Sequence, residues 1–304
     1  MTGAGTTVDE ARYLPFLEGP RSLDQASFRW RLGVRELDLR DWIELGPDAD
    51  AAIAAKPRLN AEHRPTVFAA LDGVEGEAQQ VAATLLDHLR RRWPDRYADT
   101  DLDPTLRPLD AAARLVPEDL VLMVERGGRL VFGAGSVCFP NRWDLRSKIG
   151  LALADVHAPV ALLNEQLQGP IDRFFDRLTP ERSFWRLGWG VLDTADWYTP
   201  TDGTAAPRAP DPEPTQLDPE RLYLRVERET LRRFGGSNAV LFTIRTYVTP
   251  IPSVAGDPAT RRRLAEALAA LPDPVRLYKD VASFGPALIA HLSGGDSSSE
   301  VDTI

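Results

Sequence analysis

Cysteine is the scarcest residue with a bearing on function, because Cys138 is the single example among 304 residues. One thiol cannot form a disulfide within the chain, a cysteine-rich zinc site or an iron–sulfur cluster held by four thiolates. Any such cluster used with this chain would therefore belong to a partner. Cys138 stands at the end of an apolar, strand-like run, where a buried and unreactive thiol is the ordinary outcome.

Positive charge is also in short supply. The chain has 36 Lys and Arg against 45 Asp and Glu, a net charge of −9, which argues against a nucleic-acid partner. The densest basic runs, residues 90–92 and 261–263, both fall in helical patterns. We expect both to be solvated helix faces.

Long apolar runs and nucleotide-binding loops are missing as well. No apolar stretch approaches 18 residues, and the first residues lack the charged start and apolar core of a signal peptide. We therefore expect a cytoplasmic protein with no membrane contact. Gly133-Ala134-Gly135 follows a strand-like run, but Cys138 takes the place of the third glycine of a dinucleotide fingerprint. These glycines predict a backbone kink instead.

The patterns that are present mix strands and helices. Helical spacing covers residues 76–93, 160–178 and 258–271, and strand-like runs cover 120–125, 129–139, 184–192, 222–231 and 239–248. Arg126-Gly127-Gly128 reads as the turn of a hairpin between the first two strands. This grouping predicts an α+β fold, an antiparallel sheet with helices on one side.

Two segments are predicted to be mobile because their composition is unable to form a packed core. Residues 199–219 are rich in Pro, Asp, Ala and Thr and read as a surface insertion, and residues 293–304 read as a disordered tail.

The four histidines differ in their surroundings. His157 follows a segment with helical spacing from Trp143 to Leu153, and it comes shortly before Pro159, which restrains the backbone. The pattern alone favours a capping or core histidine over a ligand. The other three are assigned no role: His63 and His88 lie among charged residues, where an exposed or rim histidine is expected, and His291 lies near the tail.

Charged residues interrupt three of the predicted strands. Alternation places Arg225 and Glu227 on one face of their strand, as an exposed surface pair or, if that face lines a pocket, as a site for a cation. Arg186 and Arg245 each interrupt an apolar strand. A buried arginine requires an anionic partner, which either a structural carboxylate or an anionic ligand would provide.

Several segments resemble the family of heme-dependent oxidative N-demethylases. SVCFPNRW (136–143) followed by VHAPV (156–160) is similar to the family's Ser-Val-Cys-Phe-Pro-Ser-Arg-Trp and Ile-His-Ala-Pro-Val. Further landmarks in the family's order are LGVRELDLRDWIEL, IDRFFDRLTPERSFWRLGWGVLD, LYLRVERETLRRF, LFTIRTYVTPI and LPDPVRLYKD. The resemblance runs from about Phe28 to about Phe284. Two positions depart from it: Asn141 replaces a serine, and Gly188 stands where an asparagine is expected.

The resemblance implies a PAS-like fold, a curved antiparallel sheet flanked by helices, that encloses a b-type heme. It implies one heme-binding domain over residues 28–292, preceded by an extension over 1–27. By this analogy His157 is the proximal iron ligand and Arg186 serves oxygen activation in the distal pocket, while Glu227 binds the amine. Arg142 and Arg245 are expected to contact heme propionates or to support the sheet.

The activity implied by the resemblance is oxidative N-demethylation of a small secondary amine such as dimethylamine, with dioxygen as oxidant and formaldehyde as product. Since the chain has neither a dinucleotide-binding loop nor the cysteines of a cluster, electrons from NADPH would come through a separate flavin and iron–sulfur reductase. A non-catalytic PAS-type heme sensor of gas or redox state is the alternative, although the chain shows neither an output domain nor a long coiled coil. A ligand-binding protein without heme is the third possibility.

Overall fold

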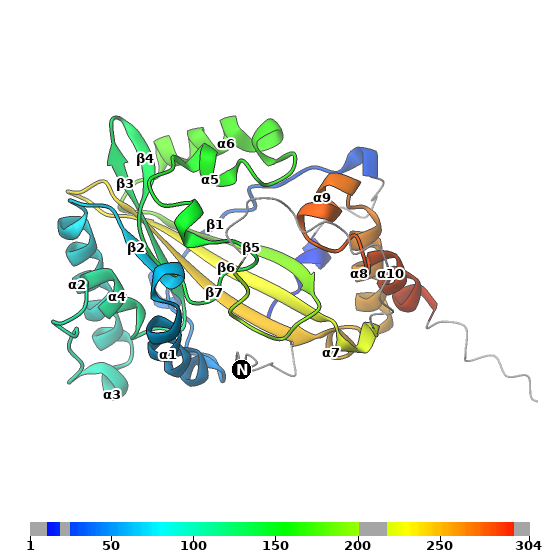
Figure 1. Ribbon diagram of the computed structural model, residues 1–304, viewed down its shortest axis with the longest axis horizontal. Helices are drawn as coiled ribbons and strands as arrows, with labels where there is room; N and C mark the ends of the chain where they lie inside the picture. The colour runs from blue at the N-terminus through cyan, green and yellow to red at the C-terminus, as the bar shows by residue number, and fades with distance from the viewer. Residues whose placement is uncertain (1–10, 19–24, 201–217, 295–304) are drawn as a thin grey trace, which may run out of the picture.

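The computed structural model describes residues 11–18, 25–200 and 218–294. Seven strands of the described residues form one antiparallel sheet in the order β1-β5-β6-β7-β3-β4-β2 (Figure 1). They are β1 (Arg35–Leu37), β2 (Phe68–Ala70), β3 (Asp119–Arg126), β4 (Arg129–Ser136), β5 (Ser183–Leu192), β6 (Tyr223–Arg233) and β7 (Val240–Pro250). The antiparallel sheet and the α+β class are therefore confirmed.

The predicted hairpin is formed by β3 and β4, where Arg126 pairs with Arg129. Gly127 and Gly128 turn the chain with φ of 59° and 75°, a region that glycine enters without the clash of a β-carbon. The predicted kink is also present. Leu122 pairs with Ala134 and Met123 with Phe132, so Gly133 is the extra residue of a β-bulge.

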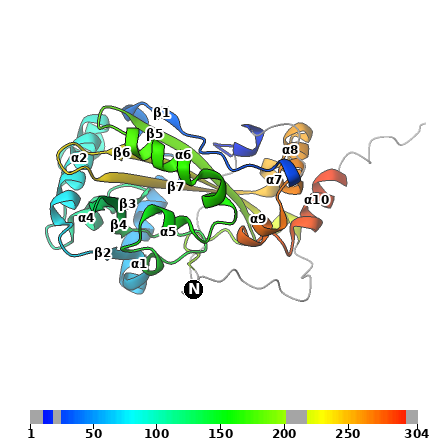
Figure 2. The ribbon, with the colours of Figure 1, turned by 90° about the horizontal axis from the view of Figure 1, so that it is seen from above.

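Helices cover both faces of the sheet, so the prediction of helices on one side is wrong. The helices are α1 (Ala49–Val67), α2 (Glu75–Arg92), α3 (Pro94–Tyr97), α4 (Pro108–Ala113), α5 (Leu153–His157), α6 (Leu163–Arg177), α7 (Ile251–Val254), α8 (Pro258–Ala269), α9 (Asp273–Tyr278) and α10 (Gly285–Gly294). Figure 2 shows α6 lying over the strands.

The hydrophobic contacts show which helices cover which face. On the first face, here called the α6 face, Phe184, Leu231 and Phe242 pack with Ile171 and Phe175 of α6. The opposite face, here called the α2 face, has one apolar cluster under α2 and α4 and a second one under α8 and α10. Strand alternation alone assigned residues to two faces, but only the long-range contacts show that both are covered.

Sequence patterns located α2, α6 and α8 well. Acidic residues in the first turn of α2 and Arg90, Arg91 and Arg92 in its last turn complement the helix dipole. The side chain of Asp257 caps α8 by accepting a hydrogen bond of 2.7 Å from the backbone N–H of Thr260. α1 contains Pro57 and Pro65 and is kinked at His63, features that weaken a helical signal in the sequence.

The helical spacing between Trp143 and Leu153 is not realised, which corrects the prediction. Only Leu145–Ser147 forms a 3-10 turn, after which the backbone pairs with β4: the N–H of Phe132 donates to the carbonyl of Leu151 at 2.8 Å. Sheet hydrogen bonds therefore override the local helical pattern. The short helix α5 then ends at His157, so the position of this histidine at a helix end is confirmed.

Residues 201–217 of the predicted insertion and residues 295–304 of the predicted tail lie outside the described residues. Part of the predicted N-terminal extension is described and packs on the domain. In the 3-10 turn Pro15–Glu18, Phe16 is 3% exposed, and its ring centre lies 5.7 Å from that of Trp189. None of the helices in the described ranges is long and apolar enough to cross a membrane.

Candidate functional site

His157 ends α5 with a half-buried imidazole. Its Nδ1 is buried and has no hydrogen-bond partner among the described residues. Burial, reinforced by the positive charges of Arg186 and Lys148, lowers the pKa of His157 to about 4. The imidazole is therefore neutral at pH 7 and keeps a lone pair for a metal. Lys148 also donates to the carbonyl of Val156 at 2.8 Å, which fixes the backbone beside the histidine.

Two acid–arginine pairs lie on the α6 face of β5 and β6. In the sheet register Arg186 stands opposite Glu229, and Gly188 stands opposite Glu227. Nη1 of Arg186 donates to Oε2 of Glu229 at 3.3 Å, and Nε of Arg225 donates to Oε1 of Glu227 at 3.1 Å. The predicted common face of Arg225 and Glu227 is confirmed by this register.

The Arg225–Glu227 pair is not the exposed surface pair that the sequence left open. The Arg225 side chain is fully buried, and that of Glu227 is 22% exposed. Arg225 also donates to the carbonyls of Trp197 and Phe139 and to the hydroxyl of Thr246. Because these acceptors hold the guanidinium in place, Arg225 fixes the orientation of the Glu227 carboxylate.

Glu229 is a site residue that the sequence reasoning missed. Burial raises its pKa; the charge of Arg186 opposes this shift, and the charge of Glu227 adds to it. The signal was available, because the alternation that put Arg225 and Glu227 on one face extends to Glu229 two residues later.

Lys279, at the end of α9, is a second residue that was missed. Its Nζ donates to the carbonyl of Trp189 at 2.5 Å and lies over the rings of Trp30 and Trp189, 5.5 and 5.6 Å from their centres. Burial lowers its pKa to about 8, although the charge of Glu227 opposes this shift. No strand or helix periodicity of its own segment links Lys279 to β5 and β6, so only the tertiary structure brings it there.

Arg142 and Arg245 lie in different parts of the molecule. Arg142 pairs with Asp193 at 2.6 Å and with Asp280, thereby joining the end of β5 to the segment after α9. Arg245 lies on the α2 face, where it pairs with Asp48. The sheet therefore lies between Arg245 and the face that α5 and α6 cover.

Cys138 is confirmed as a buried thiol, with 0% of its surface exposed. Burial is the main cause that raises its pKa to about 12. The side-chain amide of Asn60 donates to its sulfur at 3.6 Å. At neutral pH the sulfur therefore stays protonated and is a poor ligand for iron.

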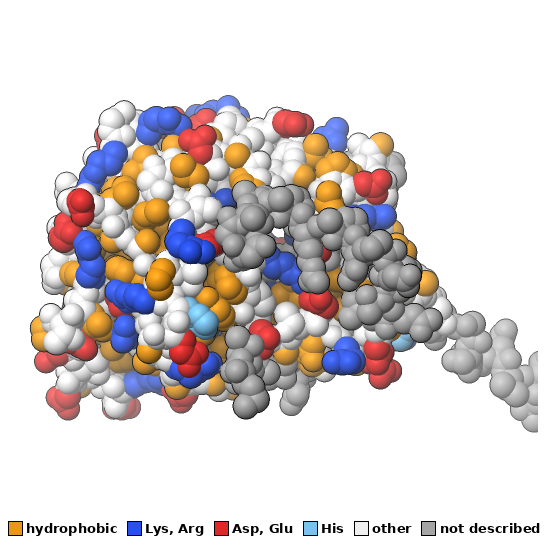
Figure 3. All heavy atoms as spheres, in the orientation of Figure 1, with side chains coloured by type: hydrophobic (Ala, Val, Ile, Leu, Met, Phe, Trp, Pro, Cys, Tyr) orange, Lys and Arg blue, Asp and Glu red, His pale blue; other side chains and the backbone are white. Residues whose placement is uncertain are grey.

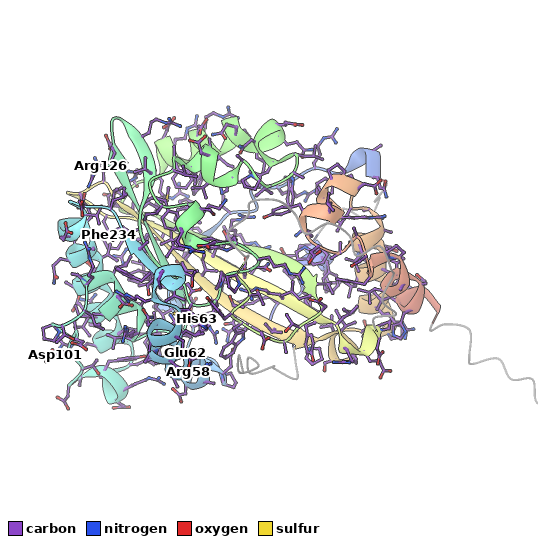
Figure 4. All side chains as sticks on the ribbon, viewed as in Figure 1. Arg58, Glu62, His63, Asp101, Arg126 and Phe234 are labelled. Carbon is purple, nitrogen blue, oxygen red and sulfur yellow. The ribbon has the colours of Figure 1, made fainter. Side chains whose placement is uncertain are left out.

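The remaining histidines lie apart from these groups. His63, labelled in Figure 4, lies on α1 near Glu62 and stacks on Tyr198 at 4.6 Å between ring centres. His88 is buried against Trp42 and Trp93, so the expectation of an exposed or rim histidine is wrong for this residue. His291 is exposed on α10.

The residues present fit a heme better than a metal ion held by the protein alone. Among the residues described, no group of three or more His, Cys, Asp or Glu could hold a metal ion. A heme iron needs only an axial ligand from the protein, because the macrocycle supplies four ligands. His157 is the residue that could serve as this ligand, because its imidazole is neutral and its buried Nδ1 has no partner in the described chain. Arg186, whose positive charge acts on His157, also has a buried Nε without a partner there.

Acidic and basic side chains are interspersed over the face in Figure 3. A hollow of about 180 Å³ is lined by Arg12, Arg40, Arg92 and Trp93 among others, and it contains none of the predicted site residues.

Most of the chain matches one known protein family. The family model described as "Haem-dependent oxidative N-demethylase, alpha subunit-like" matches residues 33–289.

Proposed function

This chain belongs to the haem-dependent oxidative N-demethylase, alpha subunit-like, family, and we propose that it removes a methyl group from a small secondary amine such as dimethylamine. The observation that carries the proposal is the combination of His157 with the α6 face of β5 and β6. His157 offers a neutral imidazole with an unpaired buried nitrogen, and Glu227 offers a carboxylate for an ammonium group. The two belong to one region, because the positive charge of Arg186 lowers the pKa of His157 and also opposes the rise in the pKa of Glu229, which lies on the same face of β6 as Glu227.

His157 is the proposed axial ligand of a b-type heme. We further propose that residues 28–292 form one PAS-like domain that encloses the heme, and that Arg142, which already binds two carboxylates, contacts a propionate. When bound, the heme supplies the chemistry that reduces dioxygen and oxidises a carbon–hydrogen bond.

Glu227 and Arg186 take different parts in the proposed reaction. Oε1 of Glu227 is held by Arg225, so Oε2 is available to accept a charge-assisted hydrogen bond from a protonated amine. The guanidinium of Arg186 would stabilise the negative charge that develops as dioxygen is reduced. The two side chains would thus place the ammonium group of the substrate near the negative charge that develops on dioxygen.

The proposed monooxygenase reaction balances with electrons from outside. Dimethylamine, dioxygen, two electrons and two protons give methylamine, formaldehyde and water. We propose that NADPH provides the electrons through a separate flavin and iron–sulfur reductase, because a single cysteine cannot hold a cluster. The word "subunit" in the family description supports a protein partner.

The test is an assay of formaldehyde from the purified, heme-loaded protein with dimethylamine, dioxygen and NADPH, with and without such a reductase. We expect formaldehyde only with the reductase, and we expect Glu227→Gln to keep its heme while losing most of the amine-dependent activity. Sustained formaldehyde without reductase would contradict the partner. A heme that is reduced by the reductase yet gives no formaldehyde would favour the sensor.

A further inference from the structure

Lys148 places a positive charge beside the backbone of His157. Its Nζ donates a hydrogen bond of 2.8 Å to the carbonyl of Val156, in the peptide unit that joins Val156 to His157. We propose that this charge raises the reduction potential of a heme bound through His157, so that the heme accepts an electron more readily. The inference rests on the proposed function, because His157 is the proposed axial ligand. Lys148 acts through its charge and not through contact with the substrate.

Backbone hydrogen bonds fix the position from which Lys148 reaches α5. Its own N–H donates to the carbonyl of Leu145 at 3.0 Å, and its carbonyl accepts from the N–H of Leu151 at 3.0 Å. The N–H of Gly150 donates to the carbonyl of Phe132 on β4 at 2.8 Å. The backbone of Lys148 is therefore tied to the sheet, while its half-buried side chain extends to the last turn of α5.

The charge of Lys148 is not offset by a carboxylate. Within residues 11–18, 25–200 and 218–294, no Asp or Glu forms an ion pair with Lys148, and its side chain donates to a neutral carbonyl. Arg186, the other cation that acts on His157, pairs with Glu229 at 3.3 Å, which offsets part of its charge. Lys148 is therefore the cation near His157 that has no counter-charge in the described chain.

A positive charge at this place favours the reduced form of a nearby metal. Uptake of one electron lowers the net charge of a heme by one, so an adjacent cation stabilises the ferrous form more than the ferric form. The effect is larger where water is excluded, because the local dielectric constant is lower. The ordinary pKa of lysine, about 10.4, lies more than three units above pH 7, so Lys148 stays protonated although burial lowers its pKa.

The hydrogen bond to Val156 also supports a purely structural role. Lysine side chains near a helix C-terminus often donate to the last carbonyl groups, which otherwise lack partners. Such a cap needs an N–H donor, whereas an effect on the reduction potential needs a charge. Substitutions that separate the donor from the charge therefore distinguish the two roles.

The experiment is a spectroelectrochemical titration of the purified, heme-loaded protein without amine. Lys148→Met removes charge and donor, Lys148→Gln keeps a donor without charge, and Lys148→Arg keeps both. We expect Lys148→Met and Lys148→Gln to lower the ferrous-to-ferric ratio at a fixed potential by about tenfold, the effect of one partly buried charge. This change equals a fall of about 59 mV in the midpoint potential of a one-electron couple. Lys148→Arg should keep the wild-type potential.

Arg129 provides a control for the loss of a positive charge that is exposed to water. It begins β4 and lies 3.7 Å from Asp155 of α5, and its side chain is 64% exposed. Because water and salt screen an exposed charge, Arg129→Gln should have nearly the wild-type potential. Heme content and the ferric absorption spectrum establish that each variant is folded and retains the axial ligand.

A wild-type potential in heme-loaded Lys148→Met would overturn the inference, as would an equal fall in Arg129→Gln. A fall confined to Lys148→Met, with Lys148→Gln like the wild type, would leave Lys148 with the capping role alone. The proposed function is judged by a different measurement, the formaldehyde assay. A lowered potential in the Lys148 variants of a protein that forms no formaldehyde would support the inference and contradict the demethylation. Formaldehyde formation together with unchanged potentials would do the reverse.

Discussion

At the scale of single residues, burial acts on His157 and Cys138 in opposite ways. It lowers the pKa of the imidazole to about 4 and raises that of the thiol to about 12. In both cases the neutral form is favoured, because a low-dielectric environment penalises charge. A neutral imidazole retains a lone pair for a metal, whereas a neutral thiol is a weak ligand. The same physical effect therefore separates the two candidate iron ligands.

We predict that His157→Ala loses heme or alters its absorption spectrum strongly, while Cys138→Ser retains the spectrum of the wild-type protein. The reason is that the first change removes the proposed axial ligand and the second exchanges a buried, protonated thiol. Heme content per chain and the Soret absorption are the measurements. An identical spectrum in His157→Ala would remove His157 from the role of ligand.

At the scale of elements, the β3–β4 hairpin depends on a close contact across its bulge. A β-carbon at Gly133 would stand 2.6 Å from Cγ2 of Val124, a distance that real contacts do not show. Gly133 is the unpaired residue of the bulge in β4, and Val124 lies on β3 and is fully buried. The glycine is therefore required by packing at this position.

We predict that Gly133→Ala lowers the free energy of unfolding by about 1–3 kcal/mol through overpacking. The loss should be smaller in a Val124→Ala background, because that change removes the clashing methyl groups. Urea titration of the two single variants and the double variant gives the coupling. Gly76→Ala, on an exposed position of α2 with open space around the new carbon, serves as the control and should not destabilise. Equal losses in both backgrounds would contradict the steric explanation.

At the scale of the whole molecule, buried titratable groups make stability depend on pH with opposing signs. Burial lowers the pKa of His88 to about 4 and raises that of Glu118 to about 7. For His88 the unfolded state, with a pKa of 6.5, binds more protons than the folded state between pH 4 and 6.5. The contribution of neutral His88 to the free energy of unfolding is therefore complete above pH 6.5, and it is lost as the pH falls from 6.5 to 4. Glu118 has the opposite effect between its unfolded value of 4.5 and about 7.

A comparison with His88→Phe isolates one of these contributions, because Glu118 and His157 are the same in both proteins. We predict that the wild-type protein loses stability relative to His88→Phe as the pH falls from 7 to 4.5, by no more than about 3 kcal/mol. Free energies of unfolding from urea titrations at several pH values measure the difference. A difference that stays constant with pH would show that His88 titrates normally.

The sequence by itself determined the strands β3 to β7, the hairpin turn, the kink at Gly133 and the position of His157 at a helix end, because each depends on residues close together in the chain. It did not determine the three-residue strands β1 and β2, which are too short to show a pattern. It also determined that Arg225 and Glu227 share a face, since alternation along a strand has a fixed period. Motifs in order along the chain carried the family resemblance, which the match over residues 33–289 confirms.

Only the tertiary structure decided which face lies beside α5, because that depends on contacts between segments far apart in the chain. The sheet register put Arg186 opposite Glu229 on the α6 face, whereas Arg245 lies on the α2 face with Asp48. The same long-range packing brought Lys279 to Trp189 and replaced the helix expected before Leu153 with sheet hydrogen bonds. Local patterns specify what each segment can form, but burial and pairing between distant segments decide which side chains share a site.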